Sequence, residues 1–160
     1  MVVGGSMEVM FRVASFDDVE GIITLCNECF NETTDINLAK ERYKLTEDDR
    51  NQIYIVGEIE NKIVAHARIQ IIKTIYDDMG IYAILNHVCV KPDYRRHNLA
   101  TKMLEYIEKV CLEKQCNSIK LWSRNFRIPA HECYKKFGFT PDDSTFFYKM
   151  VDEGCSYEYR

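Results

Sequence analysis

The sequence predicts a single α/β domain, of the α+β kind, in which a mixed sheet is flanked by helices. Its 160 residues fit one domain with a sizeable core, and 46% hydrophobic against 29% charged residues is typical of a globular chain. Strand and helix patterns follow one another in the order β-α-α-β-β-β-α-β-α-β, without an internal repeat, low-complexity block or linker. Such an order favours a sheet whose faces are covered by helices.

The N-terminal part predicts one strand and two helices. Met7–Ala14 is a short apolar strand, and Ser15 followed by Asp18 forms an S-x-x-D capping pattern. Apolar residues then recur at helical spacing over 19–30, and 36–45 carries a weaker helical pattern. Residues 1–6 are interpreted as a segment added for expression ahead of a native start at Met7.

The middle of the chain predicts the centre of the sheet. Ile53–Ile59 and Ile63–Ile72 both alternate between apolar and polar residues, and the short turn at Asn61 makes them a hairpin. Ile81–Val90 is apolar almost throughout, as expected of a strand that is buried on both faces.

The C-terminal part predicts two more helices and two more strands. Leu99–Lys114 is the clearest helix, with an apolar stripe opposite a charged face. Ser118–Ser123 is a strand, and a helix follows that begins near Pro129 and ends at Gly138. Thr145–Val151 is expected to be a final strand, so the domain spans residues 7–151 and residues 152–160 form a polar tail.

Composition excludes several classes of function. The net charge is -4, whereas nucleic-acid binding favours a basic face, so no nucleic-acid partner is expected; a cationic amine is compatible with this charge. No apolar run approaches the ~18–20 residues of a membrane helix, and the N-terminus lacks the pattern of a signal peptide. We therefore expect no membrane partner and a cytoplasmic location.

The seven cysteines are expected to be reduced thiols, since a cytoplasmic chain rarely forms disulfides. Cys26-x-x-Cys29 has the spacing of half a metal site or of a redox pair. Because no second pair of ligands follows at a suitable spacing, two core cysteines on a helix are the favoured interpretation, and no metal is expected.

The segment from Val88 to Thr101 carries the clearest chemical signal. It is a buried strand, a short polar turn and the start of an amphipathic helix, whose first amides have no partner within the helix. These amides and the helix dipole create an anion site, to which Arg95 and Arg96 add positive charge and Thr101 a hydroxyl. A pyrophosphate would fit there.

This segment resembles the coenzyme A signature of the GNAT superfamily of N-acetyltransferases. The family pattern is Arg or Gln, two residues, Gly, one residue, then Gly or Ala, entered through a V-x-P-x-Y-R stretch. The matching residues are Val90, Pro92, Tyr94, Arg95 and Ala100. Asn98 stands where the family usually has its first Gly, and Asn tolerates the left-handed backbone better than most residues.

A second segment, residues 123–139, is similar to the family's later N…A-H-x-x-Y-x-x-x-G-F pattern, and the resemblance covers roughly residues 53–150. The A-H-x-x-Y form with a preceding Arg is similar to acetyltransferases that act on aminoglycosides or aminoalkylphosphonates. The family implies a twisted, mostly antiparallel mixed sheet that splays between strands 4 and 5, with acetyl-CoA as cosubstrate. The residues expected to bind it are Val88, Cys89, Val90, Arg95, Arg96, His97, Asn98, Leu99, Ala100, Thr101 and Asn125.

Two residues are candidates for catalysis. The resemblance makes Tyr134 the candidate acid that protonates the departing thiolate; without it, the place of Tyr134 on an apolar helix face would indicate a core tyrosine. His87 lies on the central strand, where many relatives carry an acidic residue, and its ordinary pKa of ~6.5 suits a base; a core histidine is an equal alternative.

His66, His97 and His131 are interpreted as structural or solvated, and Glu58 as a surface carboxylate. Asn125 is expected to bond the pantetheine arm, a helix-entry cap being the alternative.

The sequence thus predicts an enzyme that moves acetyl from acetyl-CoA to a primary amine by direct attack, most simply on a small molecule. A backbone amide near Val88 would stabilise the oxyanion. Two rivals stay open: acetylation of a protein or peptide, and an acyl-CoA-binding module without catalysis. The identity of the amine and the oligomeric state, a homodimer included, are also left open.

Overall fold

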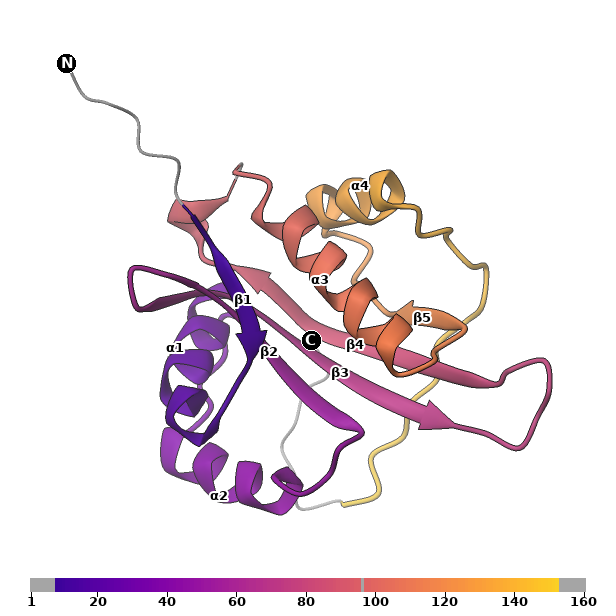
Figure 1. The fold of residues 1–160 in the computed structure, drawn as a ribbon, viewed down its shortest axis with the longest axis horizontal. Coiled ribbons are helices and arrows are strands. Elements are labelled where there is room, and N and C mark those ends of the chain that lie inside the picture. Colours follow the sequence, from indigo (N-terminus) through magenta and orange to yellow (C-terminus); the bar gives the residue numbers. More distant parts are fainter. Residues whose placement is uncertain (1–7, 96, 153–160) are drawn as a thin grey trace.

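The computed structural model describes residues 8–95 and 97–152, and its centre is a five-stranded sheet in which the strands follow their order in the chain (Figure 1). Neighbouring strands are antiparallel except for the last pair, which is parallel. This is the mixed, mostly antiparallel sheet predicted. The strands are β1 (Met10–Val13), β2 (Gln52–Ile59), β3 (Lys62–Lys73), β4 (Ile81–Val90) and β5 (Ser118–Leu121).

Helices cover both faces of the sheet, as predicted. One pair lies on one face and the other pair lies on the opposite face (Figure 1). Two short 3-10 helices, Phe16–Asp18 and Pro92–Tyr94, precede α1 and α3. The first pair is α1 (Val19–Phe30) and α2 (Ile36–Thr46), and the second is α3 (Leu99–Glu113) and α4 (Ile128–Phe137).

A network of charged side chains holds the start of the first helix in place. Asp18 accepts a hydrogen bond from the backbone N–H of Ser15 at 2.7 Å, which confirms the predicted capping pattern. The Arg12 guanidinium bridges Asp18 at 2.7 Å and Glu58 at 2.8 Å, and it holds the pKa of Asp18 down at about 2. This network ties β1, β2 and the start of α1 together. Glu58 is therefore largely buried, and its interpretation as a surface carboxylate is wrong.

The core has two parts, one on each face of the sheet. The larger lies under α3, where Met103, Leu104 and Ile107 are buried against Ile55 and Ile69 of the central strands. The smaller lies under α1 and joins five buried residues: Ile22, Leu25, Cys26, Val56 and Cys89. The helical stripe of α3 is confirmed, because Lys102, Glu105, Glu108 and Lys109 of the opposite side are all exposed.

The final strand expected at Thr145–Val151 is wrong. Residues 139–150 contain no helix or strand, and Phe147 is 85% exposed. High local β-propensity does not make a strand without a ladder partner. The ring of Phe146 packs against Trp122, with centroids 6.0 Å apart. The sheet of the described chain therefore ends at β5.

No helix in residues 8–95 and 97–152 is long and apolar enough to cross a membrane. The six cysteines of these residues are free thiols.

Candidate active site

The sheet opens between β4 and β5. β5 pairs with β4 only from Tyr82 to Leu85, while β4 continues to Val90 beside β3 (Figure 1). No other strand of the described chain pairs with that side of β4 beyond Leu85. Apart from the carbonyl of Val90, which accepts a hydrogen bond from Arg95, the backbone groups on that side can bind another extended molecule. The splay between strands 4 and 5 that the family resemblance implied is present.

A β-bulge at His87 lies directly at this opening. The register runs from Arg68 opposite Asn86 to His66 opposite Cys89, so His87 and Val88 both lie opposite one residue of β3. The backbone of His87 is left-handed, with φ 51°, which is costly for a residue other than Gly. Bulges turn backbone groups out of the ladder, often beside active sites.

The His87 side chain is half-exposed and contacts the end of α1. Its ring meets the edge of Phe30, with centroids 5.6 Å apart. Its Nε2 lies 3.9 Å from a carboxylate oxygen of Glu32, in the loop after α1. With its side chain 50% exposed, His87 is not a core histidine. An imidazole beside a carboxylate can accept and release a proton.

Tyr134 approaches from the other side of the sheet, on α4. Its ring packs edge-on against Phe139, with centroids 5.7 Å apart, and joins the α3 core. Burial raises the pKa of Tyr134 to about 12, so the hydroxyl is protonated at neutral pH. Among the described residues the hydroxyl has no hydrogen-bond partner. The phenol is thus both protonated and available as a donor.

Arg127, which sequence reasoning missed, connects the two candidates. It is the N-terminal cap residue of α4, and its guanidinium lies 4.8 Å from the centroid of Phe30, the ring that His87 contacts. The same charge acts on Tyr134, whose pKa it lowers slightly against the effect of burial. Arg127 and His87 therefore both contact one ring, and Tyr134 lies within reach of Arg127.

The predicted anion site has the expected backbone. Asn98 is the N-cap of α3 in the left-handed conformation, with φ 58°, which confirms that Asn replaces Gly there. Its side chain makes no capping bond, so it does not occupy the first amides of α3. Thr101 is half-buried, His97 is exposed, and the side chain of Leu99 is buried in the core.

The side chain of Arg95 makes a contact that the sequence did not predict. Arg95 turns back toward the strand, where its Nε donates to the carbonyl of Val90 at 3.0 Å. Arg96 lies outside the described residues. The side chains of Cys89 and Val90 are buried, so any contact with a cofactor would use their backbone.

The remaining polar residues considered from the sequence have distinct surroundings. Asn125 is exposed in the turn before α4; because Arg127 caps that helix, the alternative of a helix-entry cap is wrong. His66 is buried, its Nδ1 lies 2.9 Å from the carbonyl of Ile55, and burial lowers its pKa to about 4, which confirms a structural role. His131 contacts the Ser123 hydroxyl at 3.1 Å.

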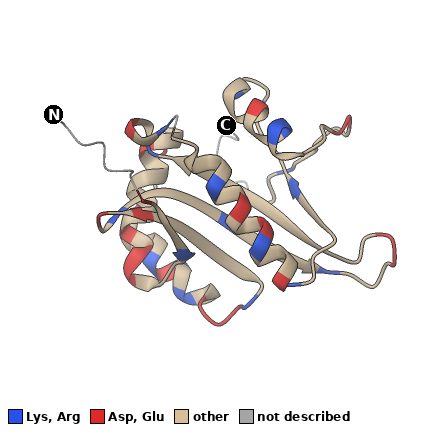
Figure 2. Ribbon diagram, turned by 45° about the horizontal axis from the view of Figure 1, so that its top comes forward, with Lys and Arg blue, Asp and Glu red and all other residues tan. Residues whose placement is uncertain are grey.

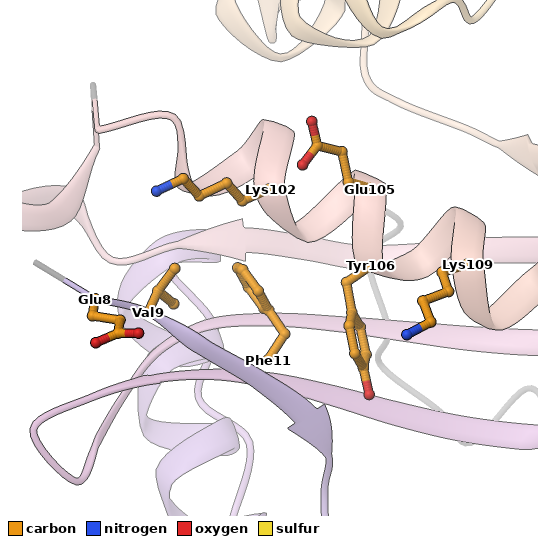
Figure 3. A pocket seen from close by; sticks show the side chains of 7 residues that line it. All are labelled: Glu8, Val9, Phe11, Lys102, Glu105, Tyr106 and Lys109. Atoms are coloured by element: carbon orange, nitrogen blue, oxygen red, sulfur yellow. The ribbon is translucent and has the colours of Figure 1, made fainter.

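A separate hollow lies away from this opening. About 650 Å³ opens between β1 and α3, at the far edge of the sheet from β5 (Figure 3). Phe11 and Tyr106 form its floor, with ring centroids 6.0 Å apart, and charged side chains of both signs surround it. None of the candidate residues lines it. Acidic and basic residues are also mixed along α3 (Figure 2), so the described chain shows no single basic face there.

Comparison with known proteins assigns this architecture. Residues 19–139 match the model of the acetyltransferase (GNAT) family. A curated relative, "Acetyltransferase SG1711" of Sodalis glossinidius, is 28% identical over 135 residues, covering 83% of this chain and 88% of that protein.

Solved structures agree on the fold. Glucosamine-6-phosphate N-acetyltransferase of Arabidopsis thaliana superimposes with a TM-score of 0.76 at 20% identity, covering 91% of this chain and 99% of that one. The aminoglycoside N-acetyltransferase AAC(6')-Iy, solved with CoA, gives a TM-score of 0.80 at 12% identity, covering 94% and 100%. At these identities the likeness concerns the fold alone.

Proposed function

Because the chain belongs to the acetyltransferase (GNAT) family, an acetyl-CoA-dependent class of enzymes, we propose that it transfers acetyl from acetyl-CoA to a primary amine of a small molecule. The observation that carries this proposal is the opening between β4 and β5. There the side of β4 that faces away from β3 has no strand partner in the described chain over Asn86–Val90, beside the bulge at His87. An extended pantetheine arm can bind to such an edge as an added strand.

The cofactor would bind along this edge and across the start of α3. Its pantetheine arm would pair with the backbone of Val88–Val90, while Asn125 bonds it from the turn after β5. Its pyrophosphate would accept hydrogen bonds from the amides that follow Asn98, with Thr101 adding its hydroxyl. Arg95 would release the carbonyl of Val90 to bind that phosphate.

The reaction would be a direct displacement at the thioester carbonyl. The amine nitrogen attacks the carbonyl carbon, and a backbone N–H at the bulge, near Val88, stabilises the oxyanion. As the C–S bond breaks, Tyr134 gives its proton to the thiolate of coenzyme A. His87 takes the proton that the ammonium group must lose, directly or through water.

The acceptor side favours a cationic small molecule. Glu32 and Phe30 adjoin His87, and the Glu32 carboxylate is exposed enough to attract an ammonium group before it loses its proton. Two relatives in fold act, by their names, on an amino sugar phosphate and on aminoglycosides, which are small amines.

A panel of amines with acetyl-CoA, read by thiol release, tests this proposal. We expect turnover with at least one small primary amine, and none with a matched panel of peptides. Turnover confined to peptides would replace the acceptor class. No turnover with either panel, together with a thermal melt unmoved by millimolar acetyl-CoA, would contradict the proposal, since a ligand at a hundredfold excess over Kd adds about 2.7 kcal/mol to stability.

A further inference from the structure

Three thiols meet between α1 and β4, directly behind the strand edge just described. Cys26 and Cys29 lie one turn apart on α1, and both pack with Cys89 of β4 in the smaller core. The Cys29 Sγ also lies 3.6 Å from the carbonyl oxygen of Val90. The proposed transfer reaction uses none of these thiols.

Charge distinguishes the members of this cluster. Cys29 is only half-buried, whereas Cys26 and Cys89 are buried. The hydrogen bond from the Cys89 thiol, with the charge of Arg95 assisting, lowers the pKa of Cys29 to about 7. The pKa of Cys89 is raised, because its thiol is shared with Cys26 and Cys29 and is buried. Cys29 therefore loses its proton near neutral pH, whereas Cys89 keeps its own.

We propose that Cys29 is a modification site, a nucleophilic thiol that reacts with hydrogen peroxide and then forms a disulfide with Cys89, and that acetyl-CoA suppresses this reaction. The suppression rests on the proposed function; the modification does not. The three requirements of such a site are met together: an accessible thiolate, a neighbouring cation and a second thiol in contact.

The chemistry balances with peroxide as the only co-reactant. The Cys29 thiolate attacks one peroxide oxygen, the O–O bond breaks, and the released hydroxide takes a proton to become water, which leaves a sulfenic acid. The Cys89 sulfur then attacks the Cys29 sulfur, the S–OH bond breaks, and the thiol proton leaves with hydroxide as a second water. Two thiols lose two electrons in total, and one peroxide gains them.

Acetyl-CoA would compete for the groups that activate Cys29. Arg95 donates to the carbonyl of Val90, whose oxygen also lies 3.6 Å from the Cys29 Sγ, and that carbonyl belongs to the strand edge at which the pantetheine arm is proposed to bind. A pyrophosphate that draws Arg95 away removes the cation beside the thiolate. A rise of about one pKa unit from this loss would cut the thiolate fraction at pH 7 by about fivefold.

The chain contains its own control pair. Cys111 and Cys116 also pack in one core, the larger one, and Cys116 is half-buried like Cys29. Lys114 lowers the pKa of Cys116 only in part, so burial still raises the pKa of both thiols, that of Cys111 to about 12. If proximity and exposure were sufficient, this pair would oxidise as readily as the cluster.

The test is limited oxidation of the full chain with hydrogen peroxide at pH 7, followed by alkylation and peptide mass mapping. We expect a cross-link between the peptides of Cys29 and Cys89, reversed by dithiothreitol, while Cys111 and Cys116 stay alkylated. Cys29→Ser should abolish the fast phase, and Cys116→Ser should not change it. Arg95→Gln leaves every thiol in place and should slow the phase about fivefold.

Three results would overturn the site: oxidation of Cys111 and Cys116 first, an unchanged rate in Cys29→Ser, or a first cross-link between Cys26 and Cys89. Saturating acetyl-CoA should slow oxidation about fivefold in the unmodified chain. If acetyl-CoA raises the melting temperature yet leaves the oxidation rate unchanged, the coupling is refuted. If it does not bind, the proposed function fails instead, and the oxidation of Cys29 without cofactor still decides the site.

Discussion

Replacing Tyr134 with Phe is the sharpest test of the proposed mechanism, because it removes one hydroxyl and keeps the ring. The ring packs against Phe139 and the α3 core, and the hydroxyl bonds to no other described residue. No buried hydrogen bond is lost, so the unfolding free energy should change by less than about 1 kcal/mol.

The turnover number of Tyr134→Phe, in contrast to its stability, should fall strongly. A pKa of about 12 keeps the Tyr134 phenol protonated at working pH, ready to donate to the leaving thiolate. General acid catalysis contributes about 10²–10⁴-fold, or roughly 3–5 kcal/mol of barrier, and turnover should fall by that factor. The KM for acetyl-CoA should hardly change, since the proton is needed only as the C–S bond breaks.

The assay measures thiol release and the melting temperature on one preparation. Tyr106→Phe is the matched control, because Tyr106 on α3 lines the hollow beside β1 (Figure 3), at the opposite edge of the sheet from β5. It should keep normal turnover. Turnover of Tyr134→Phe within about threefold of the unaltered enzyme would remove Tyr134 from the mechanism, given the ~10²-fold lower bound. The acetyltransferase assignment would stand.

Three further changes have distinct signatures. Arg95→Ala should raise the KM for acetyl-CoA about tenfold or more through loss of a charge-assisted phosphate bond, with the fold intact by circular dichroism; an unchanged KM would remove Arg95 from the cofactor site. His87→Ala should lower the rate and flatten the acid limb of the pH profile; a retained limb would identify another base. Burial lowers the pKa of His66 from 6.5 to about 4, so its imidazole is protonated more readily in the unfolded chain than in the folded one. The stability that neutral His66 contributes above pH 6.5 should therefore be lost as the pH falls toward 4, by up to about 3 kcal/mol. Denaturant titrations of the unaltered chain and of His66→Gln should show this slope only in the former.

Much of the fold could be predicted from the sequence, because periodicity encodes it locally. The helix from Leu99 and the strand Ile81–Val90 begin as predicted, since their apolar residues specify burial on one face or on both. The left-handed residue at Asn98 was also predictable, because Asn is one of the few residues that tolerate that conformation.

The rest depends on contacts between distant segments. Nothing local marks His87 as left-handed, since the bulge arises from its pairing with β3. Arg127 and Phe30 are far apart in sequence and meet only because α4 and the end of α1 lie at the same opening. The aromatic run at Phe146 looked like a strand, but the described chain provides no ladder for it.

Trp122 gives this architecture a built-in optical reporter. It is the chain's only tryptophan, it directly follows β5 at the rim of the opening, and it is 56% exposed beside Phe146. Indole emission shifts to shorter wavelength when water leaves the ring. A ligand that enters the opening and shields this rim therefore changes the intrinsic fluorescence of the whole protein, so occupancy can be followed in real time without a label, a coupled enzyme or a known acceptor.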